Sequence, residues 1–266
     1  MNILVCVKQV PLAAEVKFDP VTHTMCRDNV PAILNPADAL ALETALTLKD
    51  QSPGVGVTLL CMGAEPAKRI LKKGLSVGAD HAFLVSGRFA AGSDTLATSY
   101  ILSRAVGYIE QTQNTRFDLI LTGKQSTDGD TAQVGPQLAE HLGYGQITRA
   151  VAVTAKPAAV MVRQQAEGGG YALLEADLPC VVTVAKAERP LRSPTPGGSR
   201  AEIVVLDQET LGEWLDLSRC GLGGSPTVVQ KTFVPESKKS AAFIKADTDA
   251  DAAKKLVAIL CDANII

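Results

Sequence analysis

The sequence predicts an α/β protein whose core is a doubly wound, mostly parallel sheet. Short apolar runs of the kind that form buried parallel strands recur along the first two thirds of the chain. Stretches with helical spacing of apolar residues separate these runs, and this alternation is typical of a parallel sheet covered by helices. Polar or glycine-containing turns follow the runs that end near Val7, Cys61 and Leu121. Because ligands bind beyond the carboxyl ends of such strands, where the strand order reverses, we expect a ligand crevice at these turns.

The first half of the chain contains four predicted strand–helix units. The first helix has a clear start, with Asn35 as N-cap, Pro36 at the first helical position and Asp38 in the first turn. The third helix is expected to be capped by Ser93 or Asp94. The predicted strands are residues 3–7, 56–61, 81–85 and 119–121, and the predicted helices are 36–49, 66–74, 95–111 and a helix from Asp130 or Thr131 to Leu142.

The sequence of the second half of the chain predicts less regular structure. Residues 151–153, 160–162, 171–175 and 180–184 are predicted strands, and the glycines at 168–170 make the middle pair a β-hairpin near 160–177. Residues 187–200 are rich in Pro, Arg, Gly and Ser, which indicates an exposed loop. From residue 201 the composition predicts an arm that ends in an amphipathic helix at 248–261. We therefore expect an α/β domain at 1–186, a loop at 187–200 and an arm at 201–266.

The composition excludes several classes of function. A net charge of −2 and an aromatic content of 4% give no basic or stacking surface for nucleic acid. No apolar run approaches 18 residues, so we expect no membrane insertion. The start of the chain is better explained as a buried strand than as a signal peptide, and six cysteines without a C-x-x-C pair indicate free core thiols. These features predict a cytoplasmic protein, and no residue set suggests an acid–base pair, a nucleophile triad or a metal centre.

The stretch from Phe117 to Leu142 carries the most specific signal. An apolar run is followed by a turn containing Gly123 and Gly129 and then by a helix, an order that directs free backbone N–H groups at a phosphate. No Walker A or G-x-G-x-x-G motif is present, so this geometry alone also fits a plain βα loop. The acidic residues at 128 and 130 do not have the spacing of a calcium loop.

The amino-acid sequence of this stretch identifies a protein family more specifically than its predicted geometry does. The run Gly-Lys-Gln-Ser-Thr-Asp-Gly-Asp-Thr-Ala-Gln-Val-Gly at 123–135 closely resembles the nucleotide-binding signature of electron transfer flavoprotein (ETF) β subunits. The resemblance covers nearly the whole chain and implies a Rossmann-like fold of the adenine-nucleotide α-hydrolase type, with an arm that wraps an α subunit. It places Cys6 near the adenine and the phosphates near 128–133, with the hydroxyl of Thr131. The cofactor-binding residues it implies are Cys6, Val10, Pro11, Asn35, Asp38, Met62, Gly63, Ala64, Gly123, Lys124, Gln125, Asp128, Gly129, Asp130, Thr131, Gln133, Val134 and Gly135.

The resemblance also implies cofactors and partners. Ordinary ETFs carry AMP in the β subunit, whereas electron-bifurcating ETFs carry a second FAD there that accepts a hydride from NADH. The runs at 7–11, 19–22, 94–99 and 224–227 resemble the bifurcating group, although Leu12 stands where that group often has an acidic residue. The implied partners are an ETF α subunit, ferredoxin or flavodoxin, and an acyl-CoA dehydrogenase-type oxidoreductase. The first alternative to a bifurcating subunit with FAD is a non-bifurcating electron shuttle that holds AMP in the same site. The second alternative is a stand-alone adenine-nucleotide-binding protein.

The loop at 187–200 departs from the family pattern. In the family this segment docks on partner dehydrogenases. Here it contains Leu191-Arg192-Ser193-Pro194 without the leucine-anchored pattern and the lysine-rich run. The departure leaves the identity of the partner and the mode of docking open.

Overall fold

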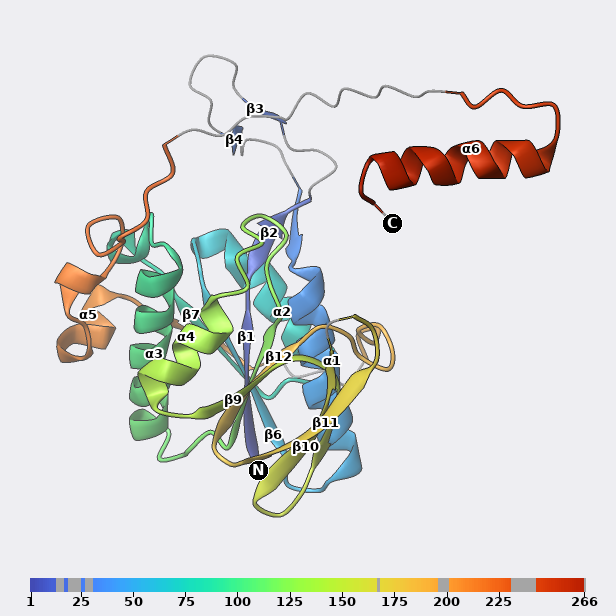
Figure 1. Ribbon diagram of the computed structural model, residues 1–266. Helices are drawn as coiled ribbons and strands as arrows, with labels where there is room; N and C mark the ends of the chain where they lie inside the picture. The colour runs from blue at the N-terminus through green and yellow to red at the C-terminus, as the bar shows by residue number, and fades with distance from the viewer. Residues whose placement is uncertain are drawn as a thin grey trace. The chain divides into compact units, whose positions relative to one another are not determined.

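The computed structural model of this protein has a nine-stranded sheet with helices on both faces (Figure 1). The structure describes residues 1–12, 31–166, 168–195, 201–230 and 243–265, together with the backbone of 17–18 and 25–26. The chain divides into two units, Met1–Lys231 and Thr232–Ile266. The first unit contains the sheet, and the second contains helix α6 (Asp249–Asp262).

The strand order across the sheet is β11-β10-β9-β12-β8-β1-β6-β7-β13. The seven strands that run across the sheet from β9 to β13 are parallel to one another. The β10–β11 hairpin adds two antiparallel strands at the β9 edge. Four short strands lie outside the sheet: β2 pairs with β5 and β3 with β4, both antiparallel. The strands are β1 (Asn2–Val7), β2 (Gln9–Pro11), β3 (Lys17–Phe18), β4 (Met25–Cys26), β5 (Ala32–Leu34), β6 (Gly56–Met62), β7 (His81–Val85), β8 (Leu119–Gly123), β9 (Gly145–Ala155), β10 (Ala159–Gln165), β11 (Tyr171–Asp177), β12 (Cys180–Val184) and β13 (Ile203–Leu206).

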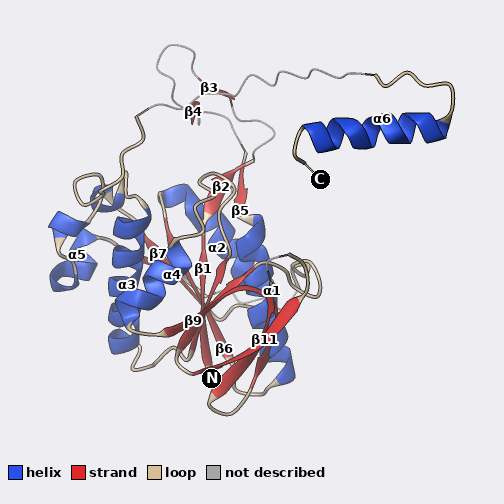
Figure 2. Ribbon diagram, in the orientation of Figure 1, coloured by secondary structure: helices blue, strands red, loops and turns tan. Residues whose placement is uncertain are grey.

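Two apolar layers cover the two faces of the sheet. One layer joins alternate strand residues such as Val5 and Leu121 to helices α1 and α2. The other joins the intervening residues such as Leu4 and Ile120 to α3, α4 and α5. Figure 2 shows α3 and α4 on one side of the sheet and α1 on the other. The helices of this unit are α1 (Pro36–Gln51), α2 (Lys68–Ser76), α3 (Thr95–Thr112), α4 (Val134–Leu142) and α5 (Gln208–Leu211), with 3₁₀ turns at Glu65–Ala67, Arg88–Ala90, Gly212–Trp214 and Leu217–Arg219.

The strand order reverses between β1 and β8. From β1 the chain passes through α1 to β6, and on through β7, toward one edge of the sheet. Helix α3 then returns the chain to β8, which pairs with β1 on its other side, Cys6 lying opposite Thr122. The carboxyl ends of β1 and β8 therefore frame the crevice where doubly wound sheets bind ligands.

Most predicted elements are confirmed. The four strand–helix units lie within a few residues of their predicted bounds, and Asp94 caps α3 by accepting hydrogen bonds from the backbone N–H groups of Leu96 and Ala97, both at 3.0 Å. The predicted hairpin pairs Ala159 with Asp177 and closes at the glycines. Strand β9 is longer than predicted because it continues through a bulge at Arg149, whose φ of 56° lies in the left-handed region.

The start of α4 differs from the prediction. The helix begins at Val134, not at Asp130 or Thr131, and no side chain caps it. Asp130 and Ala132 have φ values of 51° and 55°, and left-handed residues cannot belong to a right-handed helix. The polar residues before the helix therefore form part of the loop.

Residues 201–230 also differ from the predicted arm. Strand β13 joins the main sheet as a parallel neighbour of β7, with Ile203 opposite Ala82. The following turns pack on α3, where a Cβ atom on Gly107 would lie 2.6 Å from the ring of Trp214. This stretch thus belongs to the first unit, and the second unit begins only at Thr232.

The predicted terminal helix is present as α6, with the Thr248 hydroxyl accepting a hydrogen bond from the Asp251 N–H at 3.2 Å. Its apolar residues Leu256, Val257 and Ile259 are about half exposed. Residues 13–30, which include the run at 19–22 that resembles the bifurcating group, and the loop residues 196–200 lie outside the residues whose side chains are described. Across the described ranges, no helix has the length and apolarity that crossing a membrane requires.

Candidate functional site

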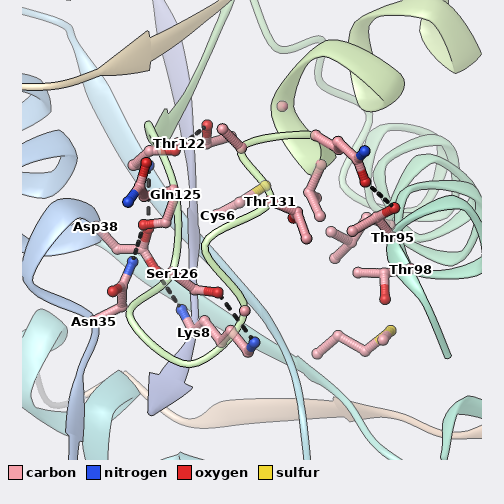
Figure 3. Close-up of a pocket in the computed structure, with 18 of the residues that line it drawn as sticks. Cys6, Lys8, Asn35, Asp38, Thr95, Thr98, Thr122, Gln125, Ser126 and Thr131 are labelled. Atoms are coloured by element: carbon pink, nitrogen blue, oxygen red, sulfur yellow. Dashed lines mark hydrogen bonds between the residues drawn. The ribbon is translucent and has the colours of Figure 1, made fainter. Parts of the chain in front are cut away.

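A cavity of about 320 Å³ lies at the carboxyl ends of β1 and β8 (Figure 3). One side is formed by the ends of these strands and by the start of α1. Figure 3 shows Thr95 and Thr98 of α3 across the cavity from Lys8, Asn35 and Asp38. The predicted site residues that line the cavity are Cys6, Asn35, Asp38, Met62, Gly123, Lys124, Gln125, Gly129, Thr131, Gln133, Val134 and Gly135.

The other predicted site residues lie outside the lining. Val10 and Pro11 belong to β2, where Val10 is buried and pairs with Ile33. Gly63 and Ala64 form the turn after β6, and the N–H of Gly63 donates to the carbonyl of Val85. Asp128 and Asp130 belong to the loop at 124–131, where their carboxylates bind other residues of the chain.

Asp38 joins the two strand ends at the base of the cavity. It is 6% exposed, and its carboxylate accepts hydrogen bonds from the backbone N–H of Lys8 at 2.7 Å and of Gly123 at 3.1 Å. Burial raises the pKa of Asp38 to about 7, although these hydrogen bonds act in the opposite direction. A Cβ atom on Gly123 would lie 2.4 Å from the Asp38 Oδ1 atom, so only glycine permits this approach. Asp38 thus links the backbone at the ends of the paired strands β1 and β8, where the ligand crevice opens.

Asn35 is the N-cap residue of α1, as predicted, but its side chain has a different role from the one expected. Its side chain makes no capping hydrogen bond to α1. Its Nδ2 atom instead donates to the carbonyl of Gln125 at 2.9 Å, and its Oδ1 atom accepts from the N–H of Thr127 at 3.3 Å. The side chain satisfies two backbone groups of the loop at 124–131, which links the start of α1 to that loop.

The same loop is attached to β1 by Lys8. The Lys8 Nζ atom lies 2.8 Å from Asp128 Oδ1 and 3.3 Å from Ser126 Oγ. Burial raises the pKa of Asp128, but the hydrogen bonds from Lys8 and Ser126 outweigh it and hold the pKa below its ordinary value. A hydrogen bond of 2.8 Å from Gln125 Nε2 to Asp130 Oδ1 closes the loop on itself. These contacts connect the loop to the end of β1 and to itself.

The entry to α4 presents free backbone donors to the cavity. Left-handed Ala132 precedes Gln133, which has right-handed φ and ψ, and such an alternation of left- and right-handed residues is typical of backbone turns that bind anions through their N–H groups. Among the described residues none accepts a hydrogen bond from the N–H of Val134 or Gly135. A Cβ atom on Gly135 would lie 2.6 Å from Thr183 Cγ2, so glycine lets the helix start close to the sheet.

Helix α3 supplies a wall of the cavity that the sequence did not predict. Ser93, Asp94, Thr95 and Thr98 all line it. The Thr95 hydroxyl donates to Gln133 Oε1 at 2.8 Å, which connects the starts of α3 and α4. The signals in the sequence are a group of hydroxyl residues in the first turn of the helix that precedes β8 and the family resemblance of the run at 94–99, neither of which indicated a cavity wall.

The remaining wall is apolar and contains Cys6, Leu60, Met62 and Leu102. Burial, followed by the neighbouring Asp38 charge, raises the pKa of the Cys6 thiol far above its ordinary value. Cys6 is therefore a neutral apolar contact and not a nucleophile. Across the described part of the chain, no three His, Cys, Asp or Glu side chains come together in a way that could hold a metal ion.

Polar donors on one side and apolar side chains on the other suit a ligand with phosphate groups and a flat ring. The free N–H groups of α4 and the hydroxyl of Thr131 would meet the phosphate. Cys6, Leu60 and Met62 would meet the ring. The residues present thus fit an adenine nucleotide or its flavin-extended form.

Comparisons with known proteins agree with this geometry. Residues 22–211 match the family described as "Electron transfer flavoprotein domain". The chain is 47% identical over 254 residues to the electron transfer flavoprotein subunit beta of Megasphaera elsdenii, covering 94% of this chain and 93% of that protein. It is 42% identical to Protein FixA of Azorhizobium caulinodans, covering 97% and 93%. It is 40% identical to the caffeyl-CoA reductase-Etf complex subunit CarD of Acetobacterium woodii over the full length of both.

The family match spans well over half of the chain, and the three relatives align along almost its whole length. These findings confirm the resemblance drawn from the signature at 123–135. The chain belongs to the electron transfer flavoprotein family, as a β subunit of the group that includes the FixA proteins.

Proposed function

We propose that this chain binds FAD in the cavity at β1 and β8 and acts with an α subunit in flavin-based electron bifurcation. In this function the heterodimer takes electrons from NADH and passes them to ferredoxin or flavodoxin and to an acyl-CoA dehydrogenase-type partner. The observation that carries the proposal is the pair of unbonded N–H groups at Val134 and Gly135, which follow left-handed Ala132 and line the cavity.

The phosphate end of the ligand is expected at this helix start. The partial positive charge of the α4 N-terminus and the free N–H groups favour an anion. Thr131 and Gln133 add polar side chains, and Lys124 adds a positive charge to the lining. Left-handed non-glycine residues are costly, so the surrounding fold must stabilise them, which is typical of ligand sites.

The hydroxyl wall of α3 favours FAD over a smaller nucleotide. One phosphate group needs only the donors around α4. Ser93, Thr95 and Thr98 are further polar contacts that a longer ligand could use. When bound, the flavin supplies the redox chemistry, accepting an electron pair and releasing electrons singly. This chain supplies binding, orientation and electrostatics.

AMP is the alternative, and the cavity volume favours it. About 320 Å³ is near the lower end of the range of roughly 300–1,000 Å³ seen for small-molecule sites. AMP would fill such a space alone, whereas the flavin half of FAD would extend beyond it. With AMP the chain would be half of an ordinary electron shuttle.

The proposed partners follow from the family and from the names of its members. β subunits of this family pair with an α subunit, and the Acetobacterium woodii relative is named for a complex with a CoA-ester reductase. We propose that residues 187–200 contact the acyl-CoA dehydrogenase-type partner and that the C-terminal unit with α6 packs on the α subunit. The half-exposed apolar residues of α6 support the second proposal. The proposed location is the cytoplasm.

Cofactor analysis of the heterodimer tests the proposal. The full-length chain is coexpressed with an ETF α subunit, purified and denatured, and the released FAD and AMP are quantified. Two FAD and negligible AMP per heterodimer are expected, followed by reduction of the bound flavins by NADH. One FAD and one AMP would replace bifurcation by the shuttle. Purification of this chain alone with bound nucleotide would instead favour a stand-alone adenine-nucleotide-binding protein.

A further inference from the structure

A second buried carboxylate lies on α1, outside the nucleotide cavity. The side chain of Glu43 is only 1% exposed. It accepts hydrogen bonds from Arg189 Nε at 2.6 Å, from Arg192 Nη2 at 2.9 Å and from the Arg192 backbone N–H at 2.9 Å. Both arginines come from the segment at 187–195, which follows β12 and has no regular secondary structure. A single carboxylate thus holds this segment at two points.

Two further residues of α1 complete the cluster. Arg192 Nη2 lies 2.8 Å from Asp50 Oδ2, and Arg189 Nη2 lies 3.4 Å from the same oxygen and 3.5 Å from the hydroxyl of Thr47. Glu43, Thr47 and Asp50 are spaced by four and three residues, so they form one stripe along the helix. We call this set of residues, Glu43, Thr47, Asp50, Arg189 and Arg192, the α1 clamp.

The clamp accounts for most of the polar contacts of the segment. Within the described part of 187–195, the other hydrogen bond to the body of the protein runs from the Thr195 N–H to the carbonyl of Ser76 at 3.1 Å. Leu191 packs partly buried against the core. A buried carboxylate that loses its partners strongly destabilises the folded state. Positions of the segment that keep both arginines on Glu43 are therefore favoured over others.

The α1 clamp contains equal numbers of acidic and basic side chains, and their contacts favour the ionised forms. Burial raises the pKa of Glu43, but the hydrogen bonds from Arg192 and Arg189 outweigh it and leave the pKa below its ordinary value. The same contacts raise the pKa of Arg192 above its ordinary value. The contacts thus favour the charged forms of both Glu43 and Arg192.

The clamp and the nucleotide cavity share one rigid element. Helix α1 begins at the cavity, where Asp38 binds the ends of β1 and β8, and Glu43 follows about one and a half turns later. The segment also leaves the sheet beside the cavity, because the Lys124 N–H donates to the carbonyl of Val184 at the end of β12. A protein that touches the segment would be held at a set distance from a bound nucleotide. Electron transfer requires such a set distance, because its rate falls steeply with separation.

We propose that Glu43 is a positioning residue for the redox partner: through Arg189 and Arg192 it holds the segment at 187–195 as a preformed contact surface for an acyl-CoA dehydrogenase-type flavoprotein. The inference rests on the proposed function, which supplies this partner class. It assigns the two arginines to the contact with α1, and it leaves the exposed residues Pro190, Ser193 and Pro194 available to the partner.

The test uses the full-length heterodimer with butyryl-CoA dehydrogenase as the acceptor. Glu43→Gln keeps the shape of the side chain but removes the charge that binds both arginines. We expect the KM for the dehydrogenase to rise about tenfold, which corresponds to one lost charged hydrogen bond, with kcat nearly unchanged. Flavin content and the rate with ferricyanide, a small acceptor that needs no docking surface, should stay at wild-type values. Hydrogen exchange should rise in residues 187–195.

Two further variants keep the test decisive. Asp50→Asn alters the exposed member of the clamp and should fold even if Glu43→Gln does not; we expect a smaller rise in KM in the same direction. Glu209→Gln removes an exposed carboxylate on α5, far along the chain from the clamp, and should leave both KM and exchange unchanged.

The outcomes separate the inference from the proposed function. Faster exchange in 187–195 with an unchanged KM would overturn the inference, because the segment would then be ordered by Glu43 without serving the partner. A wild-type heterodimer that binds flavin and reduces ferricyanide but not the dehydrogenase would overturn the partner class, and the inference with it. A parallel loss of flavin would show that Glu43 serves only stability.

Discussion

Replacing Asp38 by Asn should change how the stability of the fold depends on pH. The carboxyl group is buried at the base of the cavity, and its pKa in the folded protein is about 7, against an ordinary value of 3.8. Between these two values the folded state keeps a proton that the unfolded state has already released. The free energy of unfolding of the wild-type protein should therefore fall as the pH rises from about 4 to about 7.

The size of the effect follows from the shift. About three pKa units at 1.36 kcal/mol each give a loss of roughly 4 kcal/mol across this interval. Asn does not titrate, so the variant should lack this slope. Its amide has one acceptor for the two N–H groups of Lys8 and Gly123, which leaves one of them unpaired at a pH-independent cost of about 1–3 kcal/mol. The stability difference in favour of the wild type should therefore shrink, and can reverse, as the pH rises.

Urea unfolding of the full-length chain at a series of pH values measures this difference. Asp207→Asn is the matched control, because Asp207 is an exposed helix-capping carboxylate whose pKa is lowered by the Thr210 N–H. The contribution of Asp207 is lost only as the pH falls through its lowered pKa, so this variant should keep the wild-type slope between about pH 4 and pH 7. Parallel pH profiles for the wild type and Asp38→Asn would show that Asp38 does not titrate in this interval, and the burial argument would be refuted.

Three other substitutions test the geometry around the cavity. Gly135→Ala places a methyl group 2.6 Å from Thr183 Cγ2, so we expect a loss of about 1–3 kcal/mol in urea unfolding and a loss of bound nucleotide; full nucleotide content would contradict the close-approach argument. Lys8→Gln breaks a partly exposed ion pair with Asp128, so stability should change by about 1 kcal/mol or less. Calorimetric titration with AMP should nonetheless show weaker binding at low salt, and wild-type affinity there would mean that the loop needs no attachment. Asp94→Ala removes the cap of α3 and should cost about 1–2 kcal/mol with faster exchange in the first helical turn; unchanged exchange would argue against the cap.

The order of strands and helices could be predicted because it depends on local patterns. Apolar runs at 3–7, 56–61, 81–85 and 119–121 and the helices between them carry their own signals. Strand β13 was missed for the opposite reason. The run Ile203–Leu206 is short and follows a stretch rich in Pro and Gly, and its pairing with β7 joins residues about 120 positions apart. The amino-acid composition of residues 201–230 indicates loops, but composition carries no information about a strand pairing with a distant part of the chain.

The candidate site was predicted in part for the same reason. Turns after β1 and β8 are visible in the sequence, and they do lie together around the cavity. Asp and Thr before α4 suggest caps, yet the left-handed φ values of Asp130 and Ala132 depend on the folded surroundings. Asn35 occupies the predicted N-cap position, but its side chain binds the neighbouring loop instead of the first turn of α1. Thr95 and Thr98 reach the cavity only because α3 crosses from β7 to β8.

The position of β13 sets a limit on shortening the chain. A fragment that ended near residue 200 would remove β13 and turn β7 from an inner strand into an edge strand along its whole length. Unpaired edge strands are templates for intermolecular pairing, so such a fragment should aggregate. A fragment that ends after residue 230 keeps β13 on the edge, where its strand is short and its Val204 already faces solvent at 44% exposure. The smallest soluble form of the first unit is therefore expected to extend about thirty residues beyond the loop that the composition marks as its boundary.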